Sequence, residues 1–553
     1  MTAAAAGGHR EERFVVLAVL LLALMLRVPA LDRFPPALHQ DEASNGVDAW
    51  SLWTTGADRA GRVWPVFLEG FGDGDNRTSL YAILAVPFVA LLGPGAWATR
   101  LPAALAGAWT VLAAYLLARR LWGRTAGITA AVLLAACPWH LWLSRFGHEA
   151  SLTPAFLVSA LLLVSGRGGA GAEAAGEERP VSATRWGLAG VVLAAGLYSY
   201  PSYRLFLPLL LAGSLLAWAG PRPATRAARL AFLGGLVMAA LPLAVATLRH
   251  PDRLLARPEA ASVFGNVEPL GSALLLAAWQ YVQHFGPSFL FLRGDANPLQ
   301  SLPGGSLLAI EAITLPIGIW AAVRRWREPW SRLLLLWLLL CPLASALSLG
   351  DRPEYVPHAL RAAVGLPVFQ LLGGLGAAAA VARLRERSRN GAKPASVAIA
   401  IGTVAVAVNA VLVLALALGP WSRSVAPLYH SAWPPAMRFL RENRDRFGSA
   451  VLTAEGNPQA YVYALLYGVL TPREYRDAEK EVESTVTFHL VHRAGRLSFL
   501  HGPADLEAAK RLAGQTIWVV VVPGQLRSGR LLASFPYPDG TPGLEVREIE
   551  LRR

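Results

Sequence analysis

Charged residues are scarce in this 553-residue chain. They make up 16% of it, hydrophobic residues make up 54%, and the mean hydropathy is +0.40. Soluble proteins carry far more charge than this, so the composition excludes a fully soluble enzyme. Cysteine is scarce too, because Cys137 and Cys341 are the only two and both lie in apolar runs. Small buried hydrophobic side chains are the ordinary role of such cysteines, and a disulfide framework or a cysteine-based metal site is excluded.

Long apolar runs recur from residue 14 to residue 418. Length alone would suggest several domains, but that estimate assumes a water-soluble chain, and one large membrane domain is the better count. Charged residues rise from about 14% before residue 420 to about 23% after it. The sequence therefore predicts a polytopic α-helical membrane protein. We expect a transmembrane domain over 1–420 and a soluble α/β domain over 421–553.

The net charge of +14 is almost entirely due to arginine, and its distribution predicts the membrane topology. Arg119, Arg120 and Arg124 follow one apolar run and indicate the cytoplasmic side. If 81–92 and 273–292 are interfacial helices on the outer face, every later basic cluster falls on the cytoplasmic side. The expected crossings are 14–30, 97–118, 125–143, 151–164, 187–198, 205–219, 230–248, 306–323, 333–349, 364–381 and 396–418.

This arrangement predicts about eleven transmembrane helices, a cytoplasmic N-terminus and an extracytoplasmic C-terminal domain. It also explains the positive charge without nucleic acid, which we do not expect as a partner. Arg27 and Glu311 are the main charges inside apolar runs. Both lie near predicted outer ends, where a charged group can reach the interface.

After residue 420 the hydrophobic period changes. Short β-like runs alternate with helical ones, which predicts a small α/β domain. Expected strands cover 450–453, 485–491, 516–522 and 544–551, and expected helices cover 435–446, 458–467, 504–512 and 525–533. This segment has no glycine-rich phosphate loop, zinc spacing or nucleophile elbow. We expect it to cap the outer face or to dock an acceptor.

Adjacent carboxylates, Asp41 and Glu42, stand about ten residues after the first apolar run. On a helix these two side chains diverge by roughly 100°, whereas Asp41, Asn45 and Asp48 share a face. One carboxylate of the pair would then face a cavity. The alternative is that the pair caps the start of a juxtamembrane helix.

A second outer loop carries His148 and Glu149, again where a helix begins. Two such acidic sites on one face are able to hold a base, a substrate hydroxyl or a divalent cation. A helix cap is the structural alternative. No cofactor is firmly predicted; a divalent cation stays open, although His148 and Glu149 do not complete a coordination sphere.

Basic residues gather on the same outer side. Arg77 precedes the segment Leu80-Tyr81, and a later loop carries further candidates for binding substrate: Arg352, Tyr355, His358 and Arg361. His358 and Arg361 are three residues apart, so on a helix both face the same way. Positive charge beside carboxylates suits a lipid phosphate, and arginines that merely reach the interface are the alternative.

Taken together, these motifs resemble the GT-C membrane glycosyltransferases. The resemblance is carried by Asp41-Glu42, by Arg77 before Leu-Tyr, by the stretch 99–124 and by the acidic second loop, within about residues 12–380. The chain is most similar to glycosyltransferase family 39, the bacterial relatives of protein O-mannosyltransferases and lipid A aminoarabinose transferases. The stretch 99–124 reads TRLPAALAG at its start and LARRLWGR at its end.

This resemblance implies a hexosyl or pentosyl transferase that uses a polyprenyl-phosphate-linked sugar donor at the outer face of the cell membrane. It places the acceptor base on Asp41, with Glu42 completing the pair, a second acidic position on Glu149 and a donor-phosphate contact on Arg77. The acceptor would be a hydroxyl of a lipid, glycan or protein, attacked with inversion. The assignment of Arg352, His358 and Arg361 rests on charge and topology instead.

Two other classes of function remain open at this level. A lipid-linked substrate transporter or flippase predicts polar groups through the centre of the bundle and pseudo-symmetric halves. A non-catalytic membrane scaffold predicts that the acidic residues are dispensable. The sequence shows no internal repeat and few charges within its apolar runs, which favours the transferase.

Overall fold

The computed structural model groups the chain into two compact units, and each is described by itself. The helical unit comprises Met1–Pro29, Ala103–Leu248 and Pro258–Ala417, and the mixed unit comprises Ala30–Pro102, Arg249–Arg257 and Leu418–Arg553. The structure describes residues 3–72, 75–166, 180–221, 223, 225–251, 253, 261–350, 355–387, 393–453, 457, 459–484, 489–501 and 516–550.

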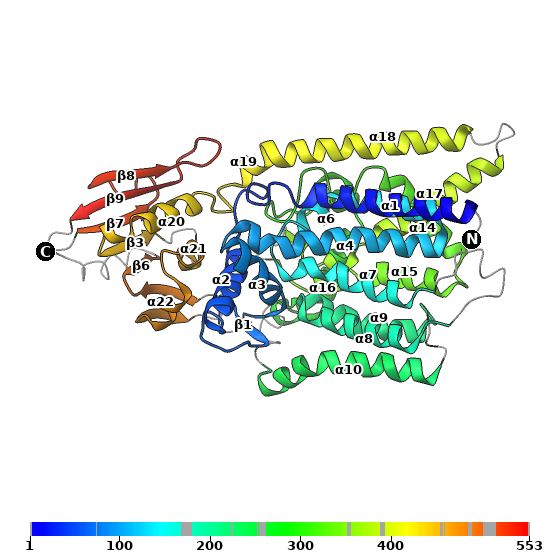
Figure 1. Cartoon of the computed structure of the whole chain (residues 1–553), viewed down its shortest axis with the longest axis horizontal. Coiled ribbons are helices and arrows are strands. Elements are labelled where there is room, and N and C mark those ends of the chain that lie inside the picture. The colour runs from blue at the N-terminus through cyan, green and yellow to red at the C-terminus, as the bar shows by residue number, and fades with distance from the viewer. Residues whose placement is uncertain are drawn as a thin grey trace. The chain divides into compact units, whose positions relative to one another are not determined.

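Every apolar run expected to cross the membrane is helical over most of its length. In Figure 1 the long helices of the helical unit run nearly parallel to one another, and α18 and α10 lie at opposite edges of the view. The elements are α1 (Ala3–Arg27), α4 (Ala96–Trp122, in this unit from Ala103), α5 (Arg124–Ala136), α6 (Pro138–Leu143), η1 (Glu149–Leu152), α7 (Thr153–Val164), α8 (Ala183–Ala195), η2 (Gly196–Tyr198), α9 (Pro201–Leu216), α10 (Arg226–Arg249), α12 (Val263–Asn266), α13 (Leu270–Gln283), η3 (Ser288–Leu292), α14 (Glu311–Arg324), α15 (Pro329–Leu340), α16 (Leu343–Ala346), η5 (Ala363–Gly365), α17 (Val368–Arg387) and α18 (Lys393–Leu416).

Five helices of the described residues are long and apolar enough to cross a membrane. They are Ala96–Trp122, Arg226–Arg249, Pro329–Ala346, Ala363–Arg387 and Pro394–Val425. In two of them, Arg226–Arg249 and Pro394–Val425, only 11% of the most apolar window is buried within the protein. Such exposed apolar faces suit contact with lipid. The count of eleven crossings stays a prediction.

Pro138 divides the expected crossing 125–143 into two helices. The apolar run 125–143 forms two helices, α5 and α6, which are separated at Cys137. Pro138 occupies the first turn of α6, where its missing N–H costs nothing, but it prevents α5 from continuing.

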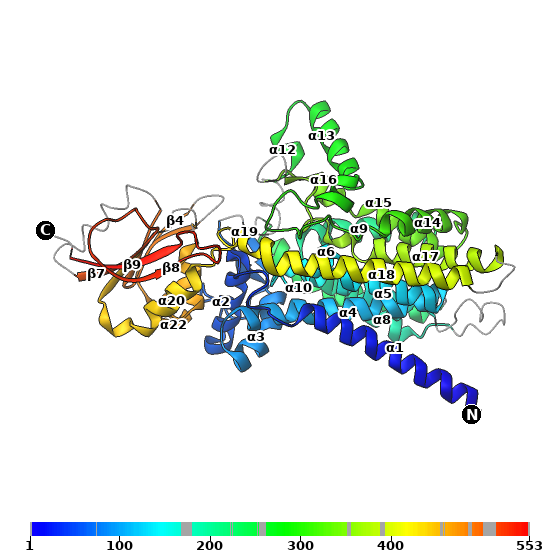
Figure 2. The same cartoon turned by 90° about the horizontal axis from the view of Figure 1, so that it is seen from above.

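The segment expected to form an outer interfacial helix over 273–292 is helical as α13 and η3. Figure 2 shows α12 and α13 projecting from the other helices of this unit. The sequence predicted a helix here, and the structure confirms the helix. Its position relative to the bilayer remains a prediction, as does that of α3 in the mixed unit.

Arg27 and Glu311 do not reach an aqueous interface, contrary to the expectation from their positions; both are fully buried. Arg27 donates to the carbonyl oxygen of Leu134 at 3.2 Å and lies 2.8 Å from Nδ1 of His140. Glu311 accepts from the Leu308 N–H at 2.9 Å and from Gln370 at 3.0 Å. Each charged group lies where a helix ends, so free backbone groups satisfy it.

The mixed unit contains a seven-stranded sheet with strand order β4-β5-β6-β3-β7-β9-β8. Its central strands β6, β3 and β7 are parallel, and the strands at both edges are antiparallel. The elements are α2 (Gln40–Thr55), β1 (Phe67–Glu69), β2 (Asn76–Thr78), α3 (Leu80–Leu92), η6 (Ala417–Trp421), α19 (Ser422–Val425), α20 (Trp433–Glu442), η7 (Arg444–Arg446), β3 (Ser449–Thr453), α21 (Ala460–Leu466), α22 (Pro472–Asp477), β4 (Lys480–Ser484), β5 (His489–Ala494), β6 (Leu497–Leu500), β7 (Thr516–Val521), β8 (Arg530–Phe535) and β9 (Leu544–Glu550).

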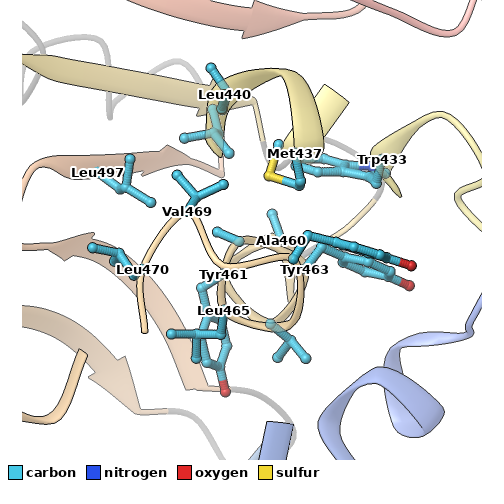
Figure 3. Packing of buried hydrophobic residues seen from close by; sticks show 14 of the residues in the cluster. Trp433, Met437, Leu440, Ala460, Tyr461, Tyr463, Leu465, Val469, Leu470 and Leu497 are labelled. Atoms are coloured by element: carbon cyan, nitrogen blue, oxygen red, sulfur yellow. The ribbon is translucent and has the colours of Figure 1, made fainter. Parts of the chain in front are cut away.

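The core of this unit lies where α21 packs between the sheet and the segment 38–47. Figure 3 shows Trp433 and Tyr463 facing each other, with ring centroids 6.0 Å apart, beside Met437 and Leu440. Leu38, Ala43 and Val47 belong to the same buried cluster, although more than 380 residues separate them from Trp433 in sequence. Residues 30–102 and the C-terminal segment thus share one core. The linear boundary at residue 420 stays a prediction.

Several predicted elements of the C-terminal segment agree with the structure, and one is wrong. Residues 525–533 were expected to be helical, but β8 occupies Arg530–Phe535. Pairing with β9 overrides the local preference, because an antiparallel hairpin satisfies the backbone of both strands. The expected helix 504–512 lies outside the described residues, and strand 485–491 is described only from His489, where β5 begins. Strands β4 and β6 were not predicted.

Candidate functional site

Asp41 lies in the first turn of α2, in the mixed unit. His39 caps this helix, with its Nδ1 accepting from the Asp41 N–H at 3.3 Å. The Asp41 carboxylate lies 3.4 Å from the same ring nitrogen, and its side chain is 36% exposed. The neighbouring Glu42 is fully buried. Of the two adjacent carboxylates, Asp41 is therefore the one that a substrate can reach.

Glu42 faces inward and holds the helix start in place. Its carboxylate accepts from the His39 N–H at 2.9 Å, which completes a capping box, and it accepts from Nε and Nη2 of Arg100, each at 2.7 Å. Arg100 also donates to the carbonyl oxygens of Leu31, Pro35 and Ala37. The pair therefore anchors the chain that leads into Asp41. A buried pair with every donor satisfied is the form in which such charges are tolerated.

Asp48 lies on the same face of α2 and joins two arginines. Arg59 donates to it at 3.0 Å, and Arg77, on β2, donates to the same oxygen. Arg77 also donates to the Asp41 carbonyl oxygen at 3.3 Å. Two guanidinium groups thus share one carboxylate, which leaves this triad with a net positive charge beside Asp41. A net positive charge at a helix N-terminus is suited to binding an anion.

A second polar cluster lies in the helical unit, where His148 caps η1. Its Nδ1 lies 3.2 Å from the Glu149 carboxylate, and its ring stacks on Phe146 with centroids 5.4 Å apart. Glu149 is almost entirely buried and interacts electrostatically with Arg204. The helix cap that the sequence offered as the structural alternative therefore occurs here, and His148 also contacts Glu149.

His358 and Arg361 lie in a turn, so the prediction that a helix aligns them is wrong. The Arg361 N–H donates to Nδ1 of His358 at 3.4 Å, while its guanidinium turns back to Ser348 at 2.8 Å. The four residues from 358 to 361 sit between two prolines, Pro357 and Pro367, which disfavour a continuous helix. Burial and the neighbouring Arg361 charge lower the pKa of His358 well below its usual range, so it is neutral.

Asp295 and His284 complete this second cluster, and neither was predicted. Asp295 accepts from the Ala359 N–H at 2.6 Å, directly beside His358, and from the Asn297 N–H at 2.8 Å. Burial raises the pKa of Asp295 to about 7. His284 is buried close enough to His358 to influence its charge, and burial lowers the pKa of His284 to about 4.

The structure therefore groups the predicted residues into two sets. Asp41, Glu42 and Arg77 meet at the start of α2, and His148, Glu149, His358 and Arg361 lie in the helical unit. Tyr355 is half-buried. Arg352 lies outside the described residues. Within the part of the chain that the structure describes, no three histidine, cysteine or acidic side chains form a group that fits a metal ion.

Arg100 is one of the site residues that the sequence did not identify, together with Arg59, His284 and Asp295. An arginine close to the start of an apolar helix was a usable signal for Arg100, because a buried charge needs a partner and Glu42 was a carboxylate without one. Arg59 and Asp295 carried no comparable signal, since each lies in a polar loop where charge is ordinary.

The fold resembles that of solved structures, and part of the chain matches a family model. Residues 77–247 match a family described as dolichyl-phosphate-mannose-protein mannosyltransferase. ArnT from Cupriavidus metallidurans bound to undecaprenyl phosphate is 14% identical, with a TM-score of 0.54 over 96% of this chain and 97% of that one. Its apo structure is 13% identical, with a TM-score of 0.52 over 99% and 98%. No curated protein matches.

The predicted resemblance to the GT-C glycosyltransferases of family 39 is thereby confirmed, by the family match for its central part and by the fold for nearly the whole chain. The chain has the fold of the two ArnT structures. The identity of its donor, its acceptor and its site residues is a separate matter.

Proposed function

We propose that this protein transfers a sugar from a polyprenyl-phosphate donor to an acceptor hydroxyl, by an inverting displacement on the extracytoplasmic face of the cell membrane. The observation that carries the proposal is the geometry around Asp41. A reachable carboxylate lies at a helix N-terminus, is anchored by the buried Glu42–Arg100 pair and adjoins the arginines around Asp48. The ArnT structure with undecaprenyl phosphate supports a lipid-phosphate donor by similarity of fold.

The donor's leaving group explains the arginines. A polyprenyl phosphate departs as an anion, so the site must stabilise its growing negative charge and need not protonate it. Arg59 is fully engaged with Asp48, Ser44 and backbone carbonyl oxygens. Arg77 retains 15% exposure and is the arginine of this triad nearest to the surface. We assign the donor-phosphate contact to Arg77, as the resemblance implied.

The acceptor requires a base, and Asp41 is placed for this role. Its carboxylate takes the proton of the acceptor hydroxyl as that oxygen attacks the anomeric carbon. The bond from the anomeric carbon to the phosphate oxygen breaks on the opposite side, and its electron pair leaves with the lipid phosphate. One such in-line displacement inverts the anomeric configuration. Glu42 acts through position, because it is buried and fixes the turn that carries Asp41.

Within the helical unit, Glu149 is proposed as a further catalytic residue, and His148, His358 and Arg361 are proposed as substrate-binding residues. His358 is neutral and buried, which suits a hydrogen bond to a hydroxyl better than a contact with a phosphate. Arg361 is held by Ser348 and Leu349, so it contributes positive charge from a fixed place. A cytoplasmic N-terminus and an outer C-terminal segment remain part of the same proposal.

The proposal is tested with three variants of the full chain in proteoliposomes that contain labelled polyprenyl-phosphate sugars and an acceptor membrane extract. We expect Asp41→Asn to lower transfer by about 10²-fold or more, as loss of a general base does. Arg77→Ala should raise the KM for the donor. Arg119→Ala is the matched control, since Arg119 pairs with Glu12 at 2.9 Å in the other unit. Full transfer by Asp41→Asn would overturn the base assignment.

A further inference from the structure

A cavity of about 460 Å³ opens within the mixed unit, and none of its residues belongs to the site assigned above. Its walls come from three segments: residues 32–38 before α2, the turn 92–98 between α3 and α4, and α20 with Tyr467. Cavities of roughly 300–1,000 Å³ are typical of small-ligand sites. Loop and helix residues from the N-terminal and the C-terminal parts of the chain line the cavity together and give it a defined shape.

Arg438 provides the cation in this cavity. Its guanidinium lies over the ring of Tyr467, 5.4 Å from the centroid, and its side chain is exposed. Among the described residues it forms no ion pair, unlike Arg441 one turn further along α20, which lies 3.7 Å from Glu442. Stacking on the tyrosine fixes the plane of the guanidinium and leaves its edge free to donate hydrogen bonds.

The remaining polar groups of the cavity point to a ligand with hydroxyl groups. Asp32 is exposed at the same cavity and supplies a carboxylate that accepts hydrogen bonds. Ser431 lines the cavity as well, and its buried hydroxyl has no hydrogen-bond partner among the described residues. An unsatisfied buried hydroxyl is costly, and a ligand group beside it would offset that cost.

Trp97 supplies a flat apolar surface to the same cavity, with 37% of the residue exposed. One cation, one carboxylate, a hydroxyl and an indole face match the surface of a sugar ring. Its hydroxyl groups both donate and accept, and its C–H face packs on an aromatic ring. A phosphate or other simple anion fits less well, because Asp32 would repel it.

The cavity also adjoins the segment that carries the proposed base. Ala37 and Leu38 line it, and they precede Asp41 by only three or four residues. Both are held rigidly, Ala37 by Arg100 and Leu38 by the Tyr463 hydroxyl, which donates to its carbonyl oxygen at 2.9 Å. A ring bound in the cavity would therefore lie at a fixed distance from the start of α2.

We propose that this cavity is a saccharide-binding subsite that holds a neutral, hydroxyl-rich sugar of the acceptor. The assignment of the sugar to the acceptor rests on the proposed transferase function, whereas the binding itself does not. Arg438 and Asp32 bind hydroxyl groups of the ring, and Trp97 packs on its C–H face. The acceptor class is then a glycan or a glycolipid.

Binding is measured by saturation-transfer NMR on the full chain in lipid nanodiscs. The probes are methyl α-glucoside, methyl α-mannoside, methyl α-galactoside and maltose, with glycerol as the non-ring control. We expect saturation of ring protons for at least one sugar and not for glycerol. Arg438→Gln and Trp97→Ala should each weaken binding about tenfold, the loss of roughly one good contact. Arg441→Gln, on the same helix but paired with Glu442, should bind as the wild type does.

Two further experiments distinguish the proposed sugar binding from the proposed transfer reaction. Asp41→Asn should lower transfer by about 10²-fold or more and leave sugar binding unchanged. Sugar binding by the wild type without any transfer would contradict the proposed transferase function but not the saccharide subsite. Inorganic phosphate should not displace the sugar. The saccharide assignment would be overturned if no probe binds or if binding survives Arg438→Gln. It would also be overturned if phosphate displaces the sugar in a way that depends on Arg438. Unchanged thermal unfolding of Arg438→Gln shows that any loss is local.

Discussion

The Glu42–Arg100 pair shows how one buried contact supports the chemistry of its neighbour. Both side chains are fully buried, and Arg100 links Glu42 to three backbone carbonyl oxygens of the preceding loop. The two carboxylates that are adjacent in sequence therefore have different roles: Glu42 fixes the backbone, and Asp41 stays at the surface. The sequence predicted a pair of acidic residues at a helix start but could not show which of the two faces inward.

Removing one partner of this pair leaves a buried charge without compensation. We expect Arg100→Met to destabilise the protein by about 3–5 kcal/mol, the usual cost of breaking a buried ion pair from one side. Thermal unfolding of the purified chain in detergent measures this, with Arg441→Met as an exposed control. The double variant Glu42→Gln/Arg100→Met should recover part of the loss. If the single variant unfolds at the wild-type temperature, the pair does not anchor the loop.

Packing between α14 and α17 depends on two glycines that no functional motif indicated. A Cβ on Gly318 would collide with the Leu372 carbonyl oxygen, and a Cβ on Gly376 would collide with that of Thr314. The two helix backbones therefore lie in direct contact, which only residues without a side chain allow. The sequence showed an apolar helix in each place and gave no indication that they are neighbours.

Gly376→Ala should consequently destabilise the helical unit by about 1–3 kcal/mol, the usual cost of overpacking. Gly402→Ala on α18 is the matched control, because nothing lies within 4 Å of its added methyl group. Alanine is the better helix former by about 1 kcal/mol, so this control should be neutral or stabilising. Equal unfolding temperatures for both variants would contradict the close contact of α14 and α17.

The turn that carries His358 is attached to the loop before α14 through Asp295, and this attachment should depend on pH. Burial raises the pKa of Asp295 to about 7, while the Arg361 charge and two backbone N–H groups partly oppose that shift. In the unfolded chain the carboxyl titrates near 4. The folded state thus binds the extra proton between about pH 4 and 7, so stability falls as pH rises through this window and is level above it.

Asp295→Asn keeps the shape of the side chain and removes its titration. We expect the unfolding temperature of the wild type to decline between about pH 4.5 and 7 more steeply than that of the variant. Scanning fluorimetry in buffers of constant ionic strength measures both curves. Parallel curves would show that Asp295 carries no shifted proton.

At the scale of the whole molecule, the positions of the helices were predictable and their partners were not. Apolar length and flanking arginines predicted the long helices of the helical unit, because burial in lipid demands about twenty apolar residues. The sharing of one core by Leu38, Val47 and α21 was not predictable, since it depends on contacts between segments more than 380 residues apart. Strand β8 was missed for a different reason, because its pairing with β9 overrides a local preference for helix.

In the candidate site, too, some residues were predictable from the sequence and others were not. Asp41, Arg77 and Glu149 were identified because charge is scarce in an apolar chain and each charge stands out. Asp295 and Arg59 lie among other polar residues, and only three-dimensional proximity distinguishes them. The resemblance to family 39 supplied the roles of these residues, and those roles stay predictions.

The most direct test of the whole account is the reaction catalysed by the purified wild-type protein in nanodiscs. A panel of labelled polyprenyl-phosphate hexoses and pentoses is supplied with glycan acceptors, and released polyprenyl phosphate and the product's anomeric configuration are measured. The account predicts release of one lipid phosphate for each sugar transferred, with inversion. Retention of configuration, or no release from any donor of the panel, would contradict it.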